Sequence, residues 1–150
     1  MDLNKLTASI QQHEGTGKII NGRFMPYADS RGFTSIGYGR CIQLVGISHV
    51  EATYLCSNDI QLASGEAQAQ SWWPVVANDD VRSRALVEII YNLGLPKFNQ
   101  FVKAIAALSQ SDFTTCADEF RNSAWYGEVG SSPGERGYDL AQMIQTGVDP

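Results

Sequence analysis

One long helical pattern in the middle of the chain constrains the fold more than any other feature. It opens at Ser48-His49-Val50-Glu51, a capping box in which the Ser48 side chain accepts the backbone N–H of Glu51 and the Glu51 side chain reaches back. The pattern extends to about Trp72 and is ended by Pro74. Such a helix would naturally join two lobes. Its apolar stripe consists of Val50, Tyr54, Leu55, Ile60 and Leu62.

Short elements rich in turns precede this helix. Leu3, Leu6 and Ile10 recur at helical spacing, so residues 3–13 form an amphipathic helix that places Glu14 at its C-terminal end. Asn21-Gly22 between apolar runs predicts a hairpin, because both residues tolerate positive φ. A further turn at 30–32 leads to an extended run, 33–38. We expect a small antiparallel sheet of about three strands with Asp29 at its turn.

Helical patterns fill the rest of the chain. Ser132 as N-cap, Pro133 at the first helical position and Gly147 as terminator bound the last one. The fold class is therefore α+β, with a small antiparallel sheet in one lobe and a helical bundle in the other. The predicted helices cover roughly residues 79–92, 97–108, 112–122 and 133–146.

The length favours one domain. A chain of 150 residues that is 43% hydrophobic can bury a sizeable core. We expect a single domain over 1–150, with a sheet lobe at about 14–48 and a helical lobe at about 72–150 that includes the helix 3–13. Residues 1–7 lack an apolar run, so no secretory signal or membrane anchor is expected. We expect synthesis and retention in the cytoplasm until another factor releases the protein.

Cysteine and histidine usage argues against a metal or redox centre. Cys41, Cys56 and Cys116 are odd in number and widely spaced, which favours reduced, mostly structural thiols. With only His13 and His49 in addition, no metal site and no cofactor are expected. The three tryptophans could stack on sugars, but large aromatic side chains more often fill cores, and we prefer that interpretation for Trp72, Trp73 and Trp125.

Charge is distributed unevenly along the chain. The net charge is −5, yet residues 14–40 hold four basic residues against two acidic ones. An anionic polymer would therefore be attracted to the N-terminal segment. No basic run interleaved with aromatic residues is present, so nucleic acid is not an expected partner.

Glu14 and Asp29 are the residues with the clearest chemistry. Cleavage of a sugar acetal needs one protonated carboxyl to give a proton to the leaving oxygen and one ionised carboxylate to stabilise the opposite face or activate water. Glu14 at a helix end and Asp29 in a turn next to Arg31 suit these two roles. Each has a simpler reading, since Glu14 could be surface charge and Asp29 a turn residue that bonds its own backbone.

These residues belong to a longer motif. Glu14-Gly15, followed by Asp-Ser-Arg-Gly-Phe-Thr-Ser-Ile-Gly-Tyr-Gly over 29–39, resembles the catalytic signature of the phage-type lysozymes, glycoside hydrolase family 24. The resemblance extends over about residues 3–147, including the helix opened at Ser48. Weaker matches are Tyr91-Asn92-Leu93-Gly94, at a helix end beside the cleft, and Ser123-Ala124-Trp125-Tyr126.

The resemblance implies a role for each matching position. Glu14 would be the general acid, and Asp29 would activate a water molecule. The family places a threonine six residues after this aspartate to hold the water, where this chain has Ser35, which keeps the hydroxyl but loses the methyl group that restricts χ1. Substrate contacts are implied for Phe33, Gly37, Tyr38, Asn92 and Arg136. Arg136 is the candidate for an arginine that the family places near the acid.

The predicted function is a muramidase that cleaves the β-1,4 bond between N-acetylmuramic acid and N-acetylglucosamine, with inversion implied by the resemblance. Its partner would be the glycan strands of peptidoglycan, and it would act as a monomer without stable membrane insertion. Synthesis in the host bacterial cytoplasm would be followed by release to the wall by a holin or another delivery apparatus. A lytic transglycosylase, which needs no aspartate partner, and a non-catalytic wall-binding module are the alternatives.

Overall fold

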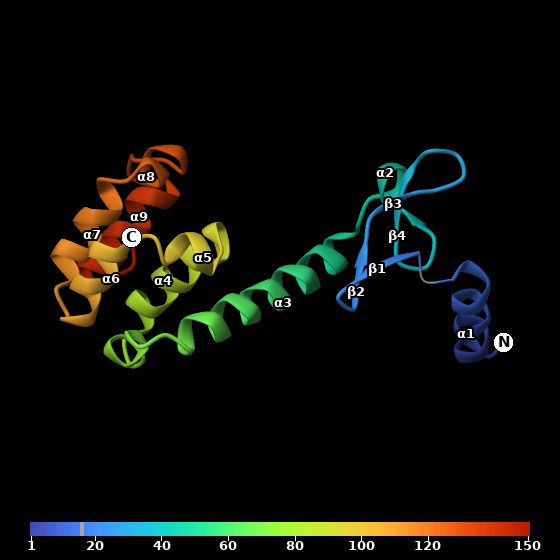
Figure 1. Ribbon diagram of the computed structural model, residues 1–150, viewed down its shortest axis with the longest axis horizontal. Coiled ribbons are helices and arrows are strands. Elements are labelled where there is room, and N and C mark those ends of the chain that lie inside the picture. The colour runs from blue at the N-terminus through green and yellow to red at the C-terminus, as the bar shows by residue number, and fades with distance from the viewer. Residues whose placement is uncertain (16) are drawn as a thin grey trace. The chain divides into compact units, whose positions relative to one another are not determined.

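The computed structural model describes residues 1–15 and 17–150, which fold into two units, Met1–Thr53 and Tyr54–Pro150. The fold mixes helices with small antiparallel sheets, as the sequence predicts (Figure 1). Helix α3 (His49–Gln68) begins in the first unit and ends in the second. The predicted division into a sheet lobe and a helical lobe that includes residues 3–13 stays a prediction.

The first helix, α1 (Leu3–Glu14), is capped at both ends by local hydrogen bonds. The Asp2 carboxylate accepts the backbone N–H groups of Asn4 at 3.0 Å and Lys5 at 3.1 Å. Gly15, with φ of 70°, ends the helix and donates its N–H to Gln11. The prediction of a helix that ends beside Glu14 is confirmed, and Glu14 is its last residue.

The predicted hairpin is also confirmed. Strands β1 (Lys18–Ile20) and β2 (Arg23–Met25) pair antiparallel, with Ile19 opposite Phe24. Asn21 and Gly22 link them with φ of 51° and 76°, the left-handed values that a two-residue hairpin turn requires.

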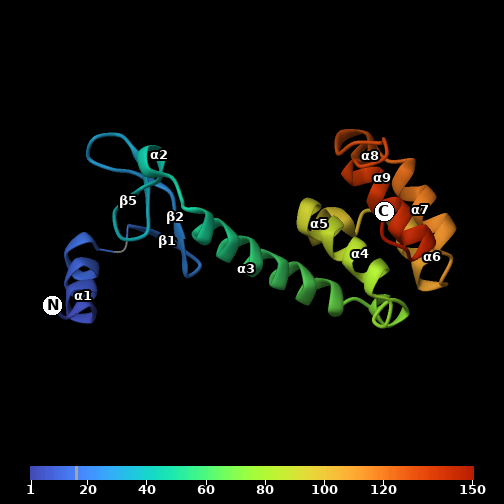
Figure 2. The same cartoon turned by 180° about the vertical axis from the view of Figure 1, so that it is seen from behind.

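The predicted single sheet of three strands is divided in the described residues. A second sheet contains β3 (Tyr27–Ala28), β4 (Thr34–Ile36) and β5 (Arg40–Cys41), with β4 in the centre. Pro26 separates β2 from β3 and lacks the N–H that a continuous ladder would use. The short helix α2 (Ile42–Val45) packs on β4 and β5 (Figure 2).

Helix α3 starts where its capping box predicts. Ser48 donates its backbone N–H to Glu51 Oε2 at 2.7 Å, and Glu51 donates its own to Ser48 Oγ at 3.2 Å. The predicted end near Trp72 is wrong, because α3 stops at Gln68. The chain turns there and buries Trp72, 2% exposed, before a 3₁₀ turn, η1 (Trp73–Val75), that contains Pro74.

The second unit is helical. Its first and last complete helices are in contact, and Arg82 of the first donates its Nε to the Ile144 carbonyl of the last at 2.8 Å. The helices surround one hydrophobic core, and Figure 1 shows their arrangement. Their bounds are α4 (Asp80–Leu93), α5 (Leu95–Phe98), α6 (Val102–Ser109), α7 (Phe113–Arg121), α8 (Ala124–Glu128) and α9 (Arg136–Thr146). The predicted helices at 79–92 and 112–122 match α4 and α7.

Two predicted helices in this unit have wrong bounds. The helix expected over 97–108 is divided into α5 and α6. Between them Gln100 and Phe101 donate their backbone N–H groups to the carbonyls three residues earlier, which are turn bonds rather than the bonds of a continuing α-helix. The last helix begins at Arg136 rather than Pro133. Gly130 accepts the N–H of Tyr138 at 3.1 Å, so the loop before α9 must first pass close to the helix.

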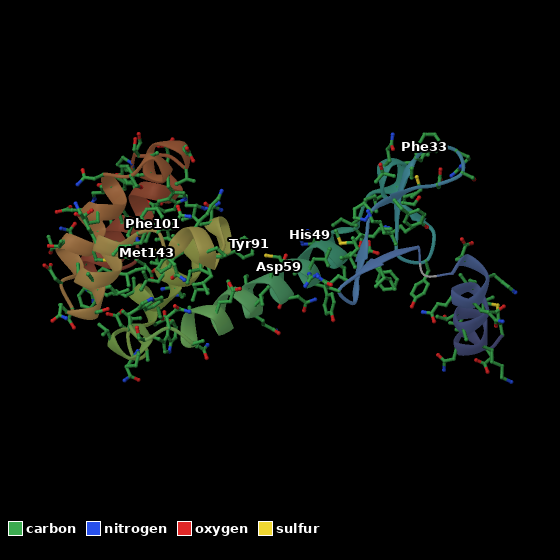
Figure 3. The ribbon with its side chains drawn as sticks, viewed as in Figure 1. Phe33, His49, Asp59, Tyr91, Phe101 and Met143 are labelled. Atoms are coloured by element: carbon green, nitrogen blue, oxygen red, sulfur yellow. The ribbon has the colours of Figure 1, made fainter. Side chains whose placement is uncertain are left out.

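Aromatic side chains form the centre of the helical core. Ring centroids of Phe98 and Phe120 are 6.0 Å apart, and those of Phe120 and Trp125 are also 6.0 Å apart. Trp72 and Trp125 are buried and Trp73 is half-buried against the same core, which confirms the core interpretation of the tryptophans. Figure 3 places Phe101 and Met143 in this unit.

The three cysteines are free thiols in different surroundings. Cys41 is half-buried, Cys56 is exposed and Cys116 on α7 is buried. Burial raises the pKa of the Cys116 thiol to about 12, with a smaller contribution from the Asp112 carboxylate. This thiol is therefore kept protonated and inert, as predicted for a structural cysteine.

Candidate active site

Asp29 lies in a turn that its own carboxylate holds together. The backbone of Asp29 exchanges hydrogen bonds across the turn, donating to Phe33 O at 2.8 Å and accepting from Gly32 N at 2.9 Å. Its Oδ1 accepts the N–H groups of Arg31 at 2.8 Å and Phe33 at 3.0 Å. The carboxylate is thus fixed to the loop between β3 and β4, which carries Phe33 (Figure 3).

The surroundings of Asp29 favour its ionised form. Partial burial raises the pKa of this carboxyl and is the largest single effect, but the hydrogen bonds from the Phe33 and Arg31 backbones and the Arg31 guanidinium together outweigh it. The Arg31 guanidinium lies 3.2 Å from Oδ2. The net result is a pKa below the ordinary value of an aspartate. Asp29 is therefore suited to remain a carboxylate and accept a proton from water.

Ser35 lies in the middle of the second sheet. It pairs with Tyr27 of β3 on one side and with Cys41 of β5 on the other. The residue is 1% exposed, and it is the buried polar residue of the described chain. Serine rotates more freely about χ1 than threonine does. Strand pairing on both sides and close packing restrict the Ser35 side chain and so offset part of this difference.

The Glu14 carboxyl group lies directly over the backbone of Gly39. A Cβ atom added at Gly39 would be 2.5 Å from Glu14 Oε2 and 3.1 Å from Glu14 Cδ. Gly39, with φ of 77°, belongs to the turn that joins β4 to β5. The fold thus brings Glu14 to the far end of the motif that begins at Asp29, although 24 positions separate 14 from 39 along the chain. The sequence predicts no contact between Gly39 and Glu14.

A second close approach lies beside the first. A Cβ atom added at Gly17 would be 2.5 Å from Tyr27 Cε1 and 3.1 Å from the Gly37 carbonyl oxygen. Gly17 therefore lies against the Tyr27 ring and the turn that contains Gly37. Gly17 and Tyr27 were not predicted as parts of the site, because no local pattern reveals that two segments approach so closely.

Arg40 anchors the residues next to Gly39. Its guanidinium donates to Glu51 Oε1 at 2.8 Å and to Glu51 Oε2 at 3.1 Å, and its Nε donates to Gly46 O at 2.9 Å. The backbone and hydroxyl of Ser48 hold the pKa of Glu51 below its usual range, and Arg40 adds to this effect. Glu51 therefore serves as the helix cap and as the partner of Arg40, a second role that the capping pattern alone does not show.

The other predicted substrate residues of this unit lie on its turns. The Arg31 guanidinium carbon is 5.2 Å from the centre of the Phe33 ring. Tyr38 is 40% exposed, and its ring meets that of Phe24 edge to face at 5.2 Å. Gly37, with φ of 62°, precedes Tyr38 in the turn between β4 and β5. Their contact with a sugar stays a prediction.

Asn92 and Arg136 belong to the second unit. Asn92, near the end of α4, accepts the indole N–H of Trp125 through Oδ1 at 2.8 Å. Arg136, the first residue of α9, donates to Glu88 Oε1 at 3.2 Å. Both side chains thus have structural partners within their own unit. Their predicted contacts with the glycan stay predictions.

A comparison with known families identifies the family of the chain. The model of the phage lysozyme family matches residues 12–134, most of the chain. The chain belongs to the phage lysozyme family. The matched segment includes Glu14, Asp29 and Ser35, whereas Arg136 lies just beyond it. The comparison with curated proteins gave no match.

Membership in the phage lysozyme family defines the general activity. The protein is a lysozyme-type glycoside hydrolase that acts on peptidoglycan. Among residues 1–15 and 17–150, no helix has both the length and the apolar character needed to cross a membrane. Within the same residues, no group of three histidine, cysteine, aspartate or glutamate side chains is arranged to hold a metal ion.

Proposed function

We propose that this phage lysozyme family member is a muramidase, EC 3.2.1.17, that hydrolyses the β-1,4 bond between N-acetylmuramic acid and N-acetylglucosamine. Glu14 protonates the departing glycosidic oxygen. Asp29 accepts a proton from the attacking water, which the Ser35 hydroxyl helps to hold. Attack on the face opposite the leaving group inverts the anomeric carbon.

The set of donors around the Asp29 carboxylate, two backbone N–H groups and the Arg31 guanidinium, is the single observation that most supports this assignment, because together they lower the pKa of this carboxyl. A general base must be ionised at the working pH, and the hydrogen bonds from Arg31 and Phe33 favour that form. If Asp29 only stabilised the turn, the two hydrogen bonds that its carboxylate accepts from the backbone would be sufficient. The Arg31 guanidinium adds a charge that stabilises the anion beyond that need.

Two isosteric substitutions test the roles of the carboxyl groups. Glu14→Gln keeps the shape of the side chain over Gly39 but removes the proton donor, and Asp29→Asn keeps an oxygen to accept the turn bonds but removes the charge. We expect each variant to lose at least about 100-fold in kcat, the lower range for loss of general acid–base catalysis. Clearing of permeabilised Gram-negative cells, followed as turbidity, measures the activity.

Matched controls lie in the second unit. Glu128 is also the last residue of a helix and exposed, and Asp112 also accepts a backbone N–H through its carboxylate, from Thr115 at 3.0 Å. Glu128→Gln and Asp112→Asn should keep full activity. Near-full activity of Asp29→Asn would instead favour a lytic transglycosylase, whose product carries a 1,6-anhydro ring. Absence of clearing by the wild-type protein would favour the non-catalytic wall-binding module.

The stereochemical outcome has its own measurement. An inverting muramidase gives the α-anomer of the new reducing end first, and NMR of freshly released fragments distinguishes it from the β-anomer. A β-anomer as the first product would overturn the water-activating role of Asp29 and indicate direct attack by this carboxylate.

Delivery and assembly are further parts of the proposal. The protein would be made in the host bacterial cytoplasm, reach the wall through a holin or another delivery apparatus, and act as a monomer without nucleic acid. Light scattering at a mass well above one chain, 16.4 kDa, would contradict the monomer. Lysis of host cells on expression without a holin would contradict the delivery route.

A further inference from the structure

We propose that Gly39 is a positioning residue for the catalytic acid, because only the absence of a side chain at this position lets the Glu14 carboxyl group occupy its place over the turn. This inference rests on the proposed role of Glu14. It concerns the β4–β5 turn, whose glycines would otherwise be explained by backbone conformation alone.

The distances to Glu14 show why position 39 has no room for a side chain. The three atoms nearest to an added Cβ at Gly39 all belong to the Glu14 side chain: Oε2 at 2.5 Å, Cδ at 3.1 Å and Cγ at 3.6 Å. The first distance is far below van der Waals contact, so one of the two groups must move. A methyl group at position 39 and the Glu14 carboxyl in its present place are mutually exclusive.

If a Cβ atom were added at position 39, the Glu14 carboxyl group would move rather than the backbone. The end of the Glu14 side chain is flexible and exposed, whereas the backbone after Gly39 is held in strand β5 and by the bonds of Arg40 to Glu51 and Gly46. Displacing a flexible side chain changes stability little. It would nevertheless move the proton donor, and a misplacement of about 1 Å can lower the rate roughly 100-fold.

Glycine could be required at position 39 for its positive φ alone. A second glycine of the same chain, Gly22, distinguishes this explanation from the contact with Glu14. Gly22 has φ of 76° against 77° for Gly39, so an alanine at either position must adopt a left-handed φ of the same size. An added Cβ at Gly22 has nothing within 4 Å. Gly22→Ala therefore reproduces the left-handed φ without the collision, and the difference between the two variants isolates the contact with Glu14.

The experiment compares Gly39→Ala with Gly22→Ala. We expect both variants to unfold at similar temperatures. Gly39→Ala should lose roughly 10- to 100-fold in kcat with little change in KM, whereas Gly22→Ala should keep wild-type kcat. If Gly39→Ala fails to fold, Gly39→Asn and Gly22→Asn replace the pair, because asparagine tolerates positive φ and still carries a Cβ. Equal kcat values in a folded pair would overturn the inference.

A double-mutant cycle with Glu14 shows whether the effect passes through the acid. In Glu14→Asp the shorter side chain retracts from the turn, so Gly39→Ala should lower kcat less than twofold in this background. A loss as large as in the wild-type background would mean that Gly39 acts independently of the acid and would overturn the proposal. Full activity of Glu14→Gln would overturn the proposed function as well, whereas an inactive Glu14→Gln beside an active Gly39→Ala would overturn only the role of Gly39.

Discussion

Asp29 illustrates how much chemistry one residue can derive from its immediate neighbours. Its two oxygens have different partners, because Oδ1 accepts two backbone N–H groups and Oδ2 faces the Arg31 guanidinium. The backbone bonds fix the position of the carboxylate. The guanidinium contributes charge, and 65% exposure of its side chain means that solvent screens this contribution.

Removal of Arg31 should change the pH dependence of catalysis. Because the guanidinium lowers the pKa of Asp29, Arg31→Gln should raise that pKa, and the acidic limb of the kcat/KM profile should move to higher pH. Asp29 would still be ionised at pH 7, so activity there should change less than about twofold. Rates measured from pH 3 to pH 8 check the shift. Arg23→Gln, on β2, is the control, and an acidic limb in Arg31→Gln that coincides with that of the control would contradict the assignment.

The sequence predicts the local positions of the two proposed catalytic carboxyl groups. Glu14 at a helix end and Asp29 in its turn follow from spacing and residue type, and the structure places both as expected. The contact between Glu14 and Gly39 could not be predicted, because it joins segments whose approach depends on the path of the chain between them. The double role of Glu51 was missed for the same reason.

Helices and strands were predicted well where residues at their ends make local hydrogen bonds or turns that the sequence reveals. The Asn21-Gly22 turn and the capping box at Ser48 are such signals, and both elements start or turn where expected. Predictions failed where tertiary contacts decide. Gly130, three residues before Pro133, accepts the backbone N–H of Tyr138, and α9 begins only at Arg136. Helix α8, capped by Ser123, was not predicted.

Arg82 links two elements of the helical unit. From α4 its Nε donates to Ile144 O at 2.8 Å and its Nη2 to Gln145 O at 3.0 Å, so it satisfies carbonyl groups in the last turn of α9. Its guanidinium also pairs with Asp79 and lies 4.0 Å from the centre of the Phe113 ring. One side chain thus connects the beginning of α4, the end of α9 and the beginning of α7.

We predict that Arg82→Ala lowers the free energy of unfolding by about 2–4 kcal/mol, because it leaves helix-end carbonyls and Asp79 without a charged donor. Denaturation in urea, followed by circular dichroism, measures the change. Arg84→Ala is the control on the same helix. Its side chain is 47% exposed and pairs with the exposed Asp80 and Asp149, so its loss should cost less than about 1 kcal/mol. Equal losses in the two variants would contradict the capping role.

At the scale of the whole chain, charge is divided between the two units. Residues 1–53 hold five basic against four acidic residues, a balance of +1, and residues 54–150 hold six against twelve, a balance of −6, which together give the net charge of −5. Two of the basic residues of the first unit, Arg31 and Arg40, have carboxylate partners. Lys18 and Arg23, on the hairpin, are the better candidates to attract an anionic wall.

The hairpin should therefore carry much of the salt dependence. Lys18→Gln combined with Arg23→Gln should lower kcat/KM on whole sacculi at low ionic strength, by up to about fivefold per charge, and the difference should vanish in high salt. Lys97→Gln combined with Lys103→Gln removes two charges from the second unit and should have a smaller effect. A salt response that is the same in both double variants would contradict this role of the hairpin.

The buried thiol of Cys116 has a consequence of another kind. A thiol-reactive dye added to the folded protein can reach Cys56 at once, but it meets Cys116 only when the helical core opens, since this side chain has no exposed surface. Where the dye reacts more slowly than the core recloses, the labelling rate at Cys116 reports the free energy of opening of that core. Cys116 is therefore a built-in chemical probe for the unfolding of the helical unit.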